Sequence, residues 1–299
     1  MISAIICTHN PREEYLTRTL DALRAQTLDT KNWELIVIDN ASTERLDESL
    51  DLSWHPDSRV VRENELGLTP ARLRGIRESK GDVLVFIDDD NVPAPDFLLS
   101  VERIGLSKPE VGAWSGSITP EFDEPPAEWT RRYWGNLVIR SVDRETWSRD
   151  YFDESTPLGA GLCVRRAVAA EYLRLHAQGL RSRMLDRAGN SLVSGGDNDL
   201  AACALDLGMT VGVTPSLRLT HIIPRERLAE DYLLRLIESI AYSGMILRSF
   251  RPATPNAPQR RGAKKIVDLI RRARMSPRDR RFVDAMKRGE TRARRELGI

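Results

Sequence analysis

The sequence predicts an α/β protein built on a mainly parallel, Rossmann-like sheet flanked by helices. Short apolar runs alternate with helix-period segments from Ile2 to Asp90, the pattern of parallel strands joined by right-handed helical crossovers. The apolar runs are continuous rather than alternating, which is typical of strands covered on both faces of a sheet. Polar residues follow several of these runs, and in such sheets ligands bind beyond the carboxyl ends of the strands.

The expected elements of the first half follow one another in a regular order. Ile2–Cys7 is the first strand, and Glu13–Gln26 is an amphipathic helix with Leu16, Leu20 and Leu23 on one face. The remaining elements are strands at Glu34–Asp39, Arg59–Arg62 (the weakest) and Val83–Ile87, and a helix at Leu68–Ser79.

The pattern changes after Val111. A strand-like run leads into Pro120–Pro157, a segment rich in tryptophan, proline and charge with little periodicity. So long a segment is expected to be functional or disordered, and its aromatic content favours an ordered surface. The later expected elements are a strand at Leu158–Val164, a helix at Arg166–Gln178, a helix from Asp197 that stops at Gly208, a strand at Leu217–His221, a long helix at Arg225–Phe250 and a short basic helix at Lys264–Arg274.

The charge is unevenly distributed along the 299 residues. The formal net charge of +1 argues against a dedicated nucleic-acid binder, but residues 251–299 hold sixteen Lys and Arg against five Asp and Glu. This basic tail has three interpretations. It attracts an anionic membrane surface, it binds nucleic acid, or it is a solvated extension. Nucleic acid is disfavoured because Phe282 is its lone aromatic residue.

The cysteines and the hydropathy predict a cytoplasmic protein. Cys7, Cys163 and Cys203 lie in apolar runs with no metal-like spacing, as buried reduced thiols do. No signal peptide is expected at the N-terminus. No stretch of 18 apolar residues without charge predicts a membrane-spanning helix. Any membrane contact is therefore expected to be peripheral, on the inner face.

Asp88, Asp89 and Asp90 directly follow a buried strand. Three adjacent carboxylates repel one another, and a divalent cation removes that repulsion. Hard oxygen ligands suit Mg²⁺ or Mn²⁺, usually shared with substrate phosphates. The alternatives are an acidic turn that caps the next helix and a phosphatase-type aspartate nucleophile, which normally follows the first strand of its fold.

Several motifs stand in order along the chain. They are I-I-C-T-H-N, V-I-D-N, N-E-L-G-L-T-P-A-R-L-R-G-I, G-D-V-L-V-F-I-D-D-D-N-V-P, then G-G-D-N-D-L and a distal histidine. From about Ile2 to His221 the chain thereby resembles the glycosyltransferase family 2 enzymes, which have a GT-A fold. The resemblance implies a catalytic domain at 1–225, divided into a nucleotide-sugar half (1–117) and an acceptor half (118–225). A helix at 226–250 and the basic tail at 251–299 would follow it.

The resemblance also implies roles for single residues. Nucleotide contacts are expected from Thr8, Asn10, Asp39, Arg72, Asp88 and Asp89. Asp90 is expected to hold the metal, Mn²⁺ or Mg²⁺, with His221 as a further ligand, so that the metal neutralises the leaving diphosphate. Taken alone, His221 would instead suggest a hydrogen-bonded histidine at a strand end. Leu73, where the family often has Asn, is a departure within the nucleotide-contact motif.

The general base is expected in the run Gly196–Asp199. Direct inversion needs a carboxylate that takes the proton of the acceptor hydroxyl, and Asp197 matches the family position best. Gly196 replaces the family's usual Glu, which keeps Asp199 as the alternative base. Either aspartate could instead cap a helix.

These roles together predict an inverting, metal-dependent hexosyltransferase of polysaccharide or glycoconjugate biosynthesis. Its donor would be a UDP-, GDP- or dTDP-linked sugar, and its acceptor a saccharide or a lipid-linked molecule. Trp129, Trp134 and Trp147 either stack on sugar rings or pack their segment onto the sheet. The rival prediction is a non-catalytic nucleotide-sugar-binding or carbohydrate-binding protein of the same fold.

Overall fold

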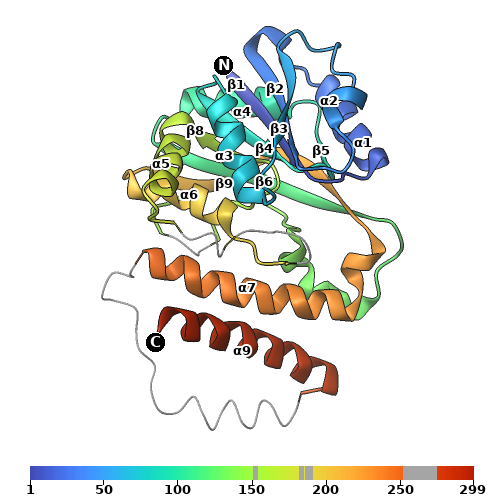
Figure 1. Ribbon diagram of the computed structural model, residues 1–299, viewed down its shortest axis with the longest axis vertical. Helices are drawn as coiled ribbons and strands as arrows, with labels where there is room; N and C mark the ends of the chain where they lie inside the picture. The colour runs from blue at the N-terminus through green and yellow to red at the C-terminus, as the bar shows by residue number, and fades with distance from the viewer. Residues whose placement is uncertain (151–153, 182–184, 186–190, 252–274) are drawn as a thin grey trace.

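The computed structural model describes residues 1–150, 154–181, 185, 191–251 and 275–299 (Figure 1). Their strands form one sheet in the order β3-β2-β1-β4-β8-β6-β9-β5, with β7 paired to β9. Helices flank this sheet, and two long helices lie side by side below it (Figure 1). The expected α/β architecture with a helical C-terminal extension is confirmed.

The parallel half of the sheet consists of β1 (Ile2–Thr8), β2 (Trp33–Asn40), β3 (Ser58–Glu63) and β4 (Val83–Ile87). In the register, Ile5 of β1 lies between Ile36 of β2 and Phe86 of β4. Every residue of β2 and β4 is buried. The continuous apolar runs therefore mark strands that are covered on both faces, as expected.

Successive side chains of each strand serve opposite faces. Ala4 and Ile6 pack with α1 (Glu13–Arg24) and α4 (Phe97–Ser107) in one core. Ile5 packs in a second core, which is formed with α3 (Leu68–Glu78), α5 (Arg166–Ala177) and α6 (Gly196–Asp206). Two cores held apart by one sheet fix the positions of the strand ends. The short elements η1 (Thr30–Asn32) and α2 (Leu46–Ser49) lie in the connections.

Beyond β4 the sheet becomes mixed. β8 (Leu162–Arg165) is antiparallel to β4 and to β6 (Val111–Phe122), and β6 is parallel to β9 (Thr210–Ile223). β5 (Asn91–Pro93) and β7 (Thr146–Ser148) are antiparallel to β9. β8 is shorter than the expected strand at Leu158–Val164, and β9 is longer than the one at Leu217–His221. The expected division at residue 117 falls within β6, which is continuous.

The described part of the segment Pro120–Pro157 contains regular structure, as its aromatic content indicates. It contains the end of β6, the 3₁₀ helix η2 (Glu128–Leu137) and β7. Its tryptophans are used in packing. Trp134 lies 5.0 Å from Phe122 between ring centroids, Trp129 lies against the guanidinium of Arg278, and Trp147 fills the space above Gly212.

The two long helices are α7 (Glu230–Phe250), which follows the short turn η4 (Arg225–Leu228), and α9 (Pro277–Leu297). Ser276 caps α9 by accepting from Asp279 N–H at 3.1 Å, and Gly298 ends it in the left-handed conformation. A Cβ on Gly289 would lie 2.0 Å from the Glu238 carbonyl oxygen, so glycine is what allows α9 to approach α7 so closely.

Three of the eight basic residues of α9 pair with acidic residues of α7. Arg278 and Arg281 pair with Glu230 at 3.0 and 2.8 Å, and Arg288 pairs with Glu238 at 2.8 Å. The interpretation of the tail as a solvated extension is therefore wrong for residues 275–299, which form a packed helix. The basic helix expected at Lys264–Arg274 lies outside the described residues.

Among the helices that the structure describes, none has the length and apolar character needed to cross a bilayer.

Candidate functional site

The carboxyl ends of β1, β2 and β4 open into one large cavity. Its volume is about 970 Å³, and Thr8, Asn40 and the aspartate triplet contribute to its wall. The cavity is closed on the far side by α7 and α9. The sequence-predicted residues that line it are Thr8, Arg72, Asp88, Asp89, Asp90, Asp197 and His221.

Strand pairing brings Asp90 and His221 together. Asn91 of β5 is the register partner of His221 on β9, which places the histidine beside the end of the triplet. Nε2 of His221 lies 3.5 Å from Oδ2 of Asp90, and both side chains are buried. A pair separated by 131 positions in the sequence is thus held by a single strand pairing.

Arg227 lies on the same two groups. Its guanidinium contacts Oδ2 of Asp90 at 3.0 Å and Nε2 of His221 at 3.1 Å. Burial alone would lower the pKa of Arg227, but the negative charge of Asp90 and its neighbours holds that pKa above its ordinary value. Sequence reasoning missed this residue, whose only signal is its position shortly after His221, on the turn η4.

The repulsion among the three carboxylates, which the sequence predicts, is visible in the pKa of Asp89. Burial and the neighbouring charge of Asp90 raise the pKa of Asp89 to about 7, against the opposing effect of a hydrogen bond donated by Thr8. The main chain of Asp88 is fixed by Asn91, which donates its N–H to the Asp88 carbonyl oxygen at 3.0 Å. A cation near these carboxylates would relieve the repulsion.

The residues fit a divalent cation that is completed by the substrate. In the described part of the chain, no group of three or more His, Cys, Asp and Glu side chains could hold a metal by itself. Oδ2 of Asp90 and Nε2 of His221 lie 3.5 Å apart and would be the two ligands, although both contact Arg227 in this structure, so the guanidinium would have to give way to the cation. Two protein ligands with the remaining positions filled by phosphate and water is the usual arrangement for a nucleotide-bound cation.

Asp197 also lines the cavity, in the first turn of α6. A Cβ on Gly159 would come within 2.2 Å of its Oδ2, so glycine is required there to admit the carboxylate. Arg72 is buried and feels the charges of both Asp197 and Asp88. Burial would lower the pKa of Arg72, but Asp197 and Asp88 hold it above its ordinary value.

The departure at Gly196 has a packing reason. A Cβ there would lie 3.1 Å from Thr69 Oγ1 and 3.3 Å from both Arg72 Nη1 and Tyr172 Oη. These distances are shorter than ordinary van der Waals contacts, so a glutamate could not be accommodated without moving Arg72. Arg72 and Tyr172 therefore take the space that a larger residue would need.

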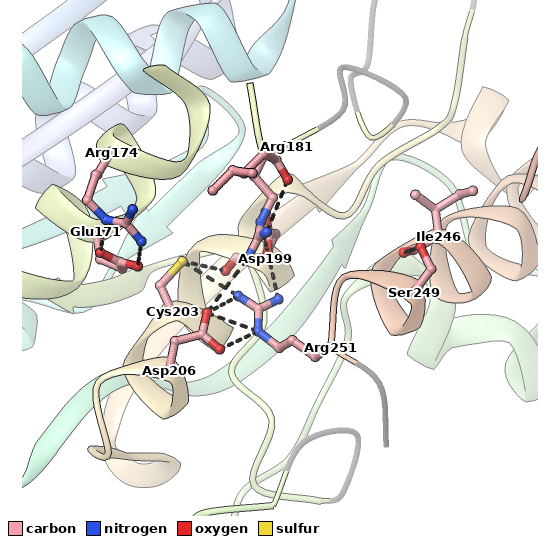
Figure 2. Close-up of polar contacts among 10 residues, drawn as sticks. Glu171, Arg174, Arg181, Asp199, Cys203, Asp206, Ile246, Ser249 and Arg251 are labelled. Atoms are coloured by element: carbon pink, nitrogen blue, oxygen red, sulfur yellow. Dashed lines mark hydrogen bonds and ion pairs between the residues drawn. The ribbon is translucent and has the colours of Figure 1, made fainter. Parts of the chain in front are cut away.

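Asp199, the alternative base, lies outside the cavity. Figure 2 shows Arg181 and Arg251 converging on its carboxylate, with Nε of Arg181 at 2.8 Å and Nη1 of Arg251 at 2.7 Å. Arg251 also contacts Asp206 at 2.6 Å. The Asp199 side chain is only 2% exposed. The geometry gives Asp199 a structural role and leaves Asp197 as the carboxylate at the cavity.

Asn10, which is exposed, and Asp39, which is buried, do not line the cavity. Asn10 Oδ1 accepts from Thr43 N–H at 2.8 Å. Asp39 accepts from Ser42 N–H at 3.1 Å and pairs with Arg62 at 2.5 Å. Both residues that were expected to contact the nucleotide therefore bind the loop that follows β2. Their sequence neighbours His9 and Asn40 do line the cavity.

The cysteines are free thiols, as expected. Cys7 lines the cavity beside Thr8, and burial raises its pKa to about 12. Burial also raises the pKa values of Cys163 and Cys203. Thiols that stay protonated at neutral pH are poor nucleophiles, so we assign Cys7 no chemical role.

Comparison with known proteins bears on this geometry. A family model described as Glycosyl transferase family 2 matches residues 3–166. The chain is 27% identical over 124 residues to the glucosyl-dolichyl phosphate glucuronosyltransferase of Haloferax volcanii, a match that covers 40% of this chain and 39% of that protein. It is 34% identical over 102 residues to the dolichol-phosphate mannosyltransferase of Pyrococcus furiosus, covering 32% and 28%. The matches thus span 39% and 28% of the lengths of these two relatives.

Solved structures share the fold. TarS 1–349 of S. aureus, in complex with UDP-GlcNAc, has a TM-score of 0.53 at 16% identity, covering 83% of this chain and 71% of that one. GalNAc-T7 with UDP, GalNAc and Mn²⁺ has a TM-score of 0.53 at 17% identity, covering 91% and 54%. The expected GT-A type of fold is confirmed.

Proposed function

The chain belongs to glycosyl transferase family 2, and from this premise we propose that it transfers a hexose from a nucleoside-diphosphate sugar to an acceptor hydroxyl with inversion. The observation that carries the proposal is that two separate acidic groups line one cavity. Asp88–Asp90 follow β4 at the strand ends, and Asp197 lies in the first turn of α6. An in-line displacement needs the leaving diphosphate on one side of the anomeric carbon and the base on the other, and these two groups would supply the two sides.

In this proposal the donor diphosphate lies at the triplet. Asp90 and His221 would hold Mn²⁺ or Mg²⁺, which as a Lewis acid neutralises the charge of the departing diphosphate. Thr8 holds Asp89 by a hydrogen bond. Arg227 lies against Asp90 and supplies a further positive charge on that side.

The bonds form and break between the aspartate triplet and Asp197. Asp197 takes the proton of the acceptor hydroxyl as its oxygen bonds to the anomeric carbon, and the bond from that carbon to the diphosphate breaks. Arg72 counters the negative charges of both Asp197 and Asp88. The products are the glycosylated acceptor, a nucleoside diphosphate and a protonated Asp197.

The relatives suggest where to search for substrates. Both solved neighbours hold a uridine nucleotide, one of them with Mn²⁺. The names of two relatives refer to dolichyl and dolichol phosphates. We therefore place UDP-sugars before GDP- and dTDP-sugars, and lipid-linked acceptors before free saccharides.

A panel assay tests the proposal. The full chain is incubated with Mn²⁺ and each nucleotide sugar, with and without acceptors, and free nucleoside diphosphate is measured. Asp90→Ala should abolish the release, and Asp96→Ala should not, because Asp96 is an exposed carboxylate paired with Arg218. Binding of a donor without any release would support the non-catalytic rival, and full activity of Asp90→Ala would overturn the metal assignment.

The basic tail adds a prediction about location. We place the enzyme in the cytoplasm, in peripheral contact with anionic lipid. Co-sedimentation with vesicles that contain anionic lipid, compared with neutral vesicles, checks this. Equal recovery with both would remove the membrane from the proposal.

A further inference from the structure

The cavity extends well past the donor residues, along α7. Tyr232, Leu236, Ile240 and Gly244 line it at intervals of four residues, so they form one face of the helix. We call these four residues the α7 strip. At 1.5 Å per residue the strip is about 18 Å long. It starts near Arg227 and therefore continues from the donor end of the cavity.

Apolar side chains of three other segments also line the cavity. Leu137 and Val138 come from the end of η2, Leu192 from the segment before α6, and Met286 from α9. Leu137 and Leu236 are buried, whereas Val138, Leu192, Ile240 and Met286 keep part of their surface exposed. Partly exposed apolar side chains from several segments that line one cavity favour an apolar ligand.

The hydroxyl group of Ser243 beside the strip is already engaged. Its Oγ donates to the Ser239 carbonyl oxygen at 2.9 Å and accepts from Ser194 N–H at 3.3 Å. Arg248 and Glu290, one turn beyond Gly244 and Met286, also line the cavity, so the apolar stretch ends there. A saccharide placed against the Leu, Ile and Met side chains would exchange hydrogen bonds with water for apolar contacts, which is unfavourable. A hydrocarbon chain gains by the same exchange.

We propose that the α7 strip binds the hydrocarbon part of a lipid-linked acceptor and thereby directs the acceptor's hydroxyl to Asp197. The proposal rests on the transferase function above and names its acceptor class. The strip's length suits a linear chain, and Asp197 borders the same cavity. Gly244 sets how much of the chain can enter, because a Cβ built there meets nothing within 4 Å.

Gly244 provides a direct test, since a larger side chain would extend into the cavity rather than into packed neighbours. Farnesyl phosphate, below its micellar concentration, is titrated into the full chain by calorimetry, with inorganic phosphate as the headgroup alone. UDP with Mn²⁺ is titrated separately. The variants are Gly244→Trp, Gly244→Leu and the control Arg235→Trp, which adds the same indole on the exposed side of α7.

We expect the wild type to bind farnesyl phosphate at least tenfold more tightly than inorganic phosphate. Gly244→Trp and Gly244→Leu should lose at least tenfold of that affinity, and Arg235→Trp should keep it. UDP binding should be unchanged throughout. Gly244→Leu keeps the test decisive if Gly244→Trp does not fold.

Equal binding of farnesyl phosphate and inorganic phosphate would overturn the proposal, as would unchanged affinity in both Gly244 variants. If the wild type binds farnesyl phosphate but no nucleotide of the donor panel, the transferase function fails rather than the strip. The two failures are therefore distinguishable.

Discussion

The substitution Asp199→Asn separates the carboxylate of α6 that two arginines hold from Asp197, the one proposed as the general base. It removes the negative charge between Arg181 and Arg251, whose side chains are 8% and 18% exposed. Breaking a buried ion pair by changing one partner typically costs about 3–5 kcal/mol. After the substitution both arginines still have Asp206 as an ion-pair partner, which lies 2.6 Å from Arg251 and 3.7 Å from Arg181. We therefore expect the lower end, about 3 kcal/mol.

The assay is thermal unfolding followed by circular dichroism. In a chain of this size about 1 kcal/mol lowers Tm by roughly 2 °C, so Asp199→Asn should lower it by about 6 °C. Well below that temperature its turnover should resemble that of the wild type, because Asp199 does not line the cavity.

Asp197→Asn is the matched control, the same chemical change two positions earlier. Asp197 offsets the charge of the buried Arg72, but Asp88 still does so after the change, so the Tm should fall by less than the drop of about 6 °C expected for Asp199→Asn. The turnover of Asp197→Asn should fall by about 10²- to 10⁴-fold, the usual contribution of a general base. If Asp199→Asn keeps the wild-type Tm and loses turnover, while Asp197→Asn stays active, the assignment of the base is refuted.

Three further predictions concern charge and burial. In the absence of nucleotide, Arg227→Gln should raise the affinity for Mn²⁺ by about tenfold or more, because the positive charge of Arg227 beside Asp90 and His221 opposes a cation. Electron paramagnetic resonance measures the bound Mn²⁺. The exposed Arg225→Gln is the control and should leave the affinity unchanged. Cys7 is half-buried, but its pKa is raised to about 12, so it should resist iodoacetamide at pH 8 until urea unfolds the chain, as mass spectrometry would show; rapid labelling of the folded protein would contradict the raised pKa. Burial acts to raise the pKa of Glu34, but hydrogen bonds donated by Ser3, Lys80 N–H and Arg59 outweigh it and hold that pKa below its ordinary 4.5. The ionised Glu34 carboxylate therefore stabilises the fold fully above pH 4.5. This stabilisation is lost as the pH falls through the pKa of the folded state. The stability difference between wild type and Glu34→Gln, from urea titrations, should shrink below pH 4.5; a constant difference would contradict the assignment.

Local features of the sequence predict the centre of the sheet and the acidic side of the site. The continuous apolar runs of β1, β2 and β4 leave little choice of structure, because each strand is buried on both faces. The triplet directly follows β4 and lies at the sheet edge wherever the strand forms. Its approach to His221 depends on the pairing of β5 with β9, which no local pattern shows.

Other features depend on partners distant in the sequence. Asp199 differs from Asp197 because it is paired with Arg181 and Arg251. Arg181 precedes α6 in the sequence and Arg251 follows α7, so no local pattern shows the pairing. Residues 275–299 resemble a free basic tail because their acidic partners lie on α7. Arg227 is positioned by the turn after β9 rather than by a motif. Long-range packing, rather than composition, decides these roles.

Metal-dependent release of nucleoside diphosphate from a nucleotide sugar tests the central claim most directly. The wild type should release it with Mn²⁺, lose the activity in EDTA and recover it when Mn²⁺ is restored. Asp90→Ala should be inactive in all three conditions. Release that is unaffected by EDTA and by Asp90→Ala would contradict the role of the aspartate triplet.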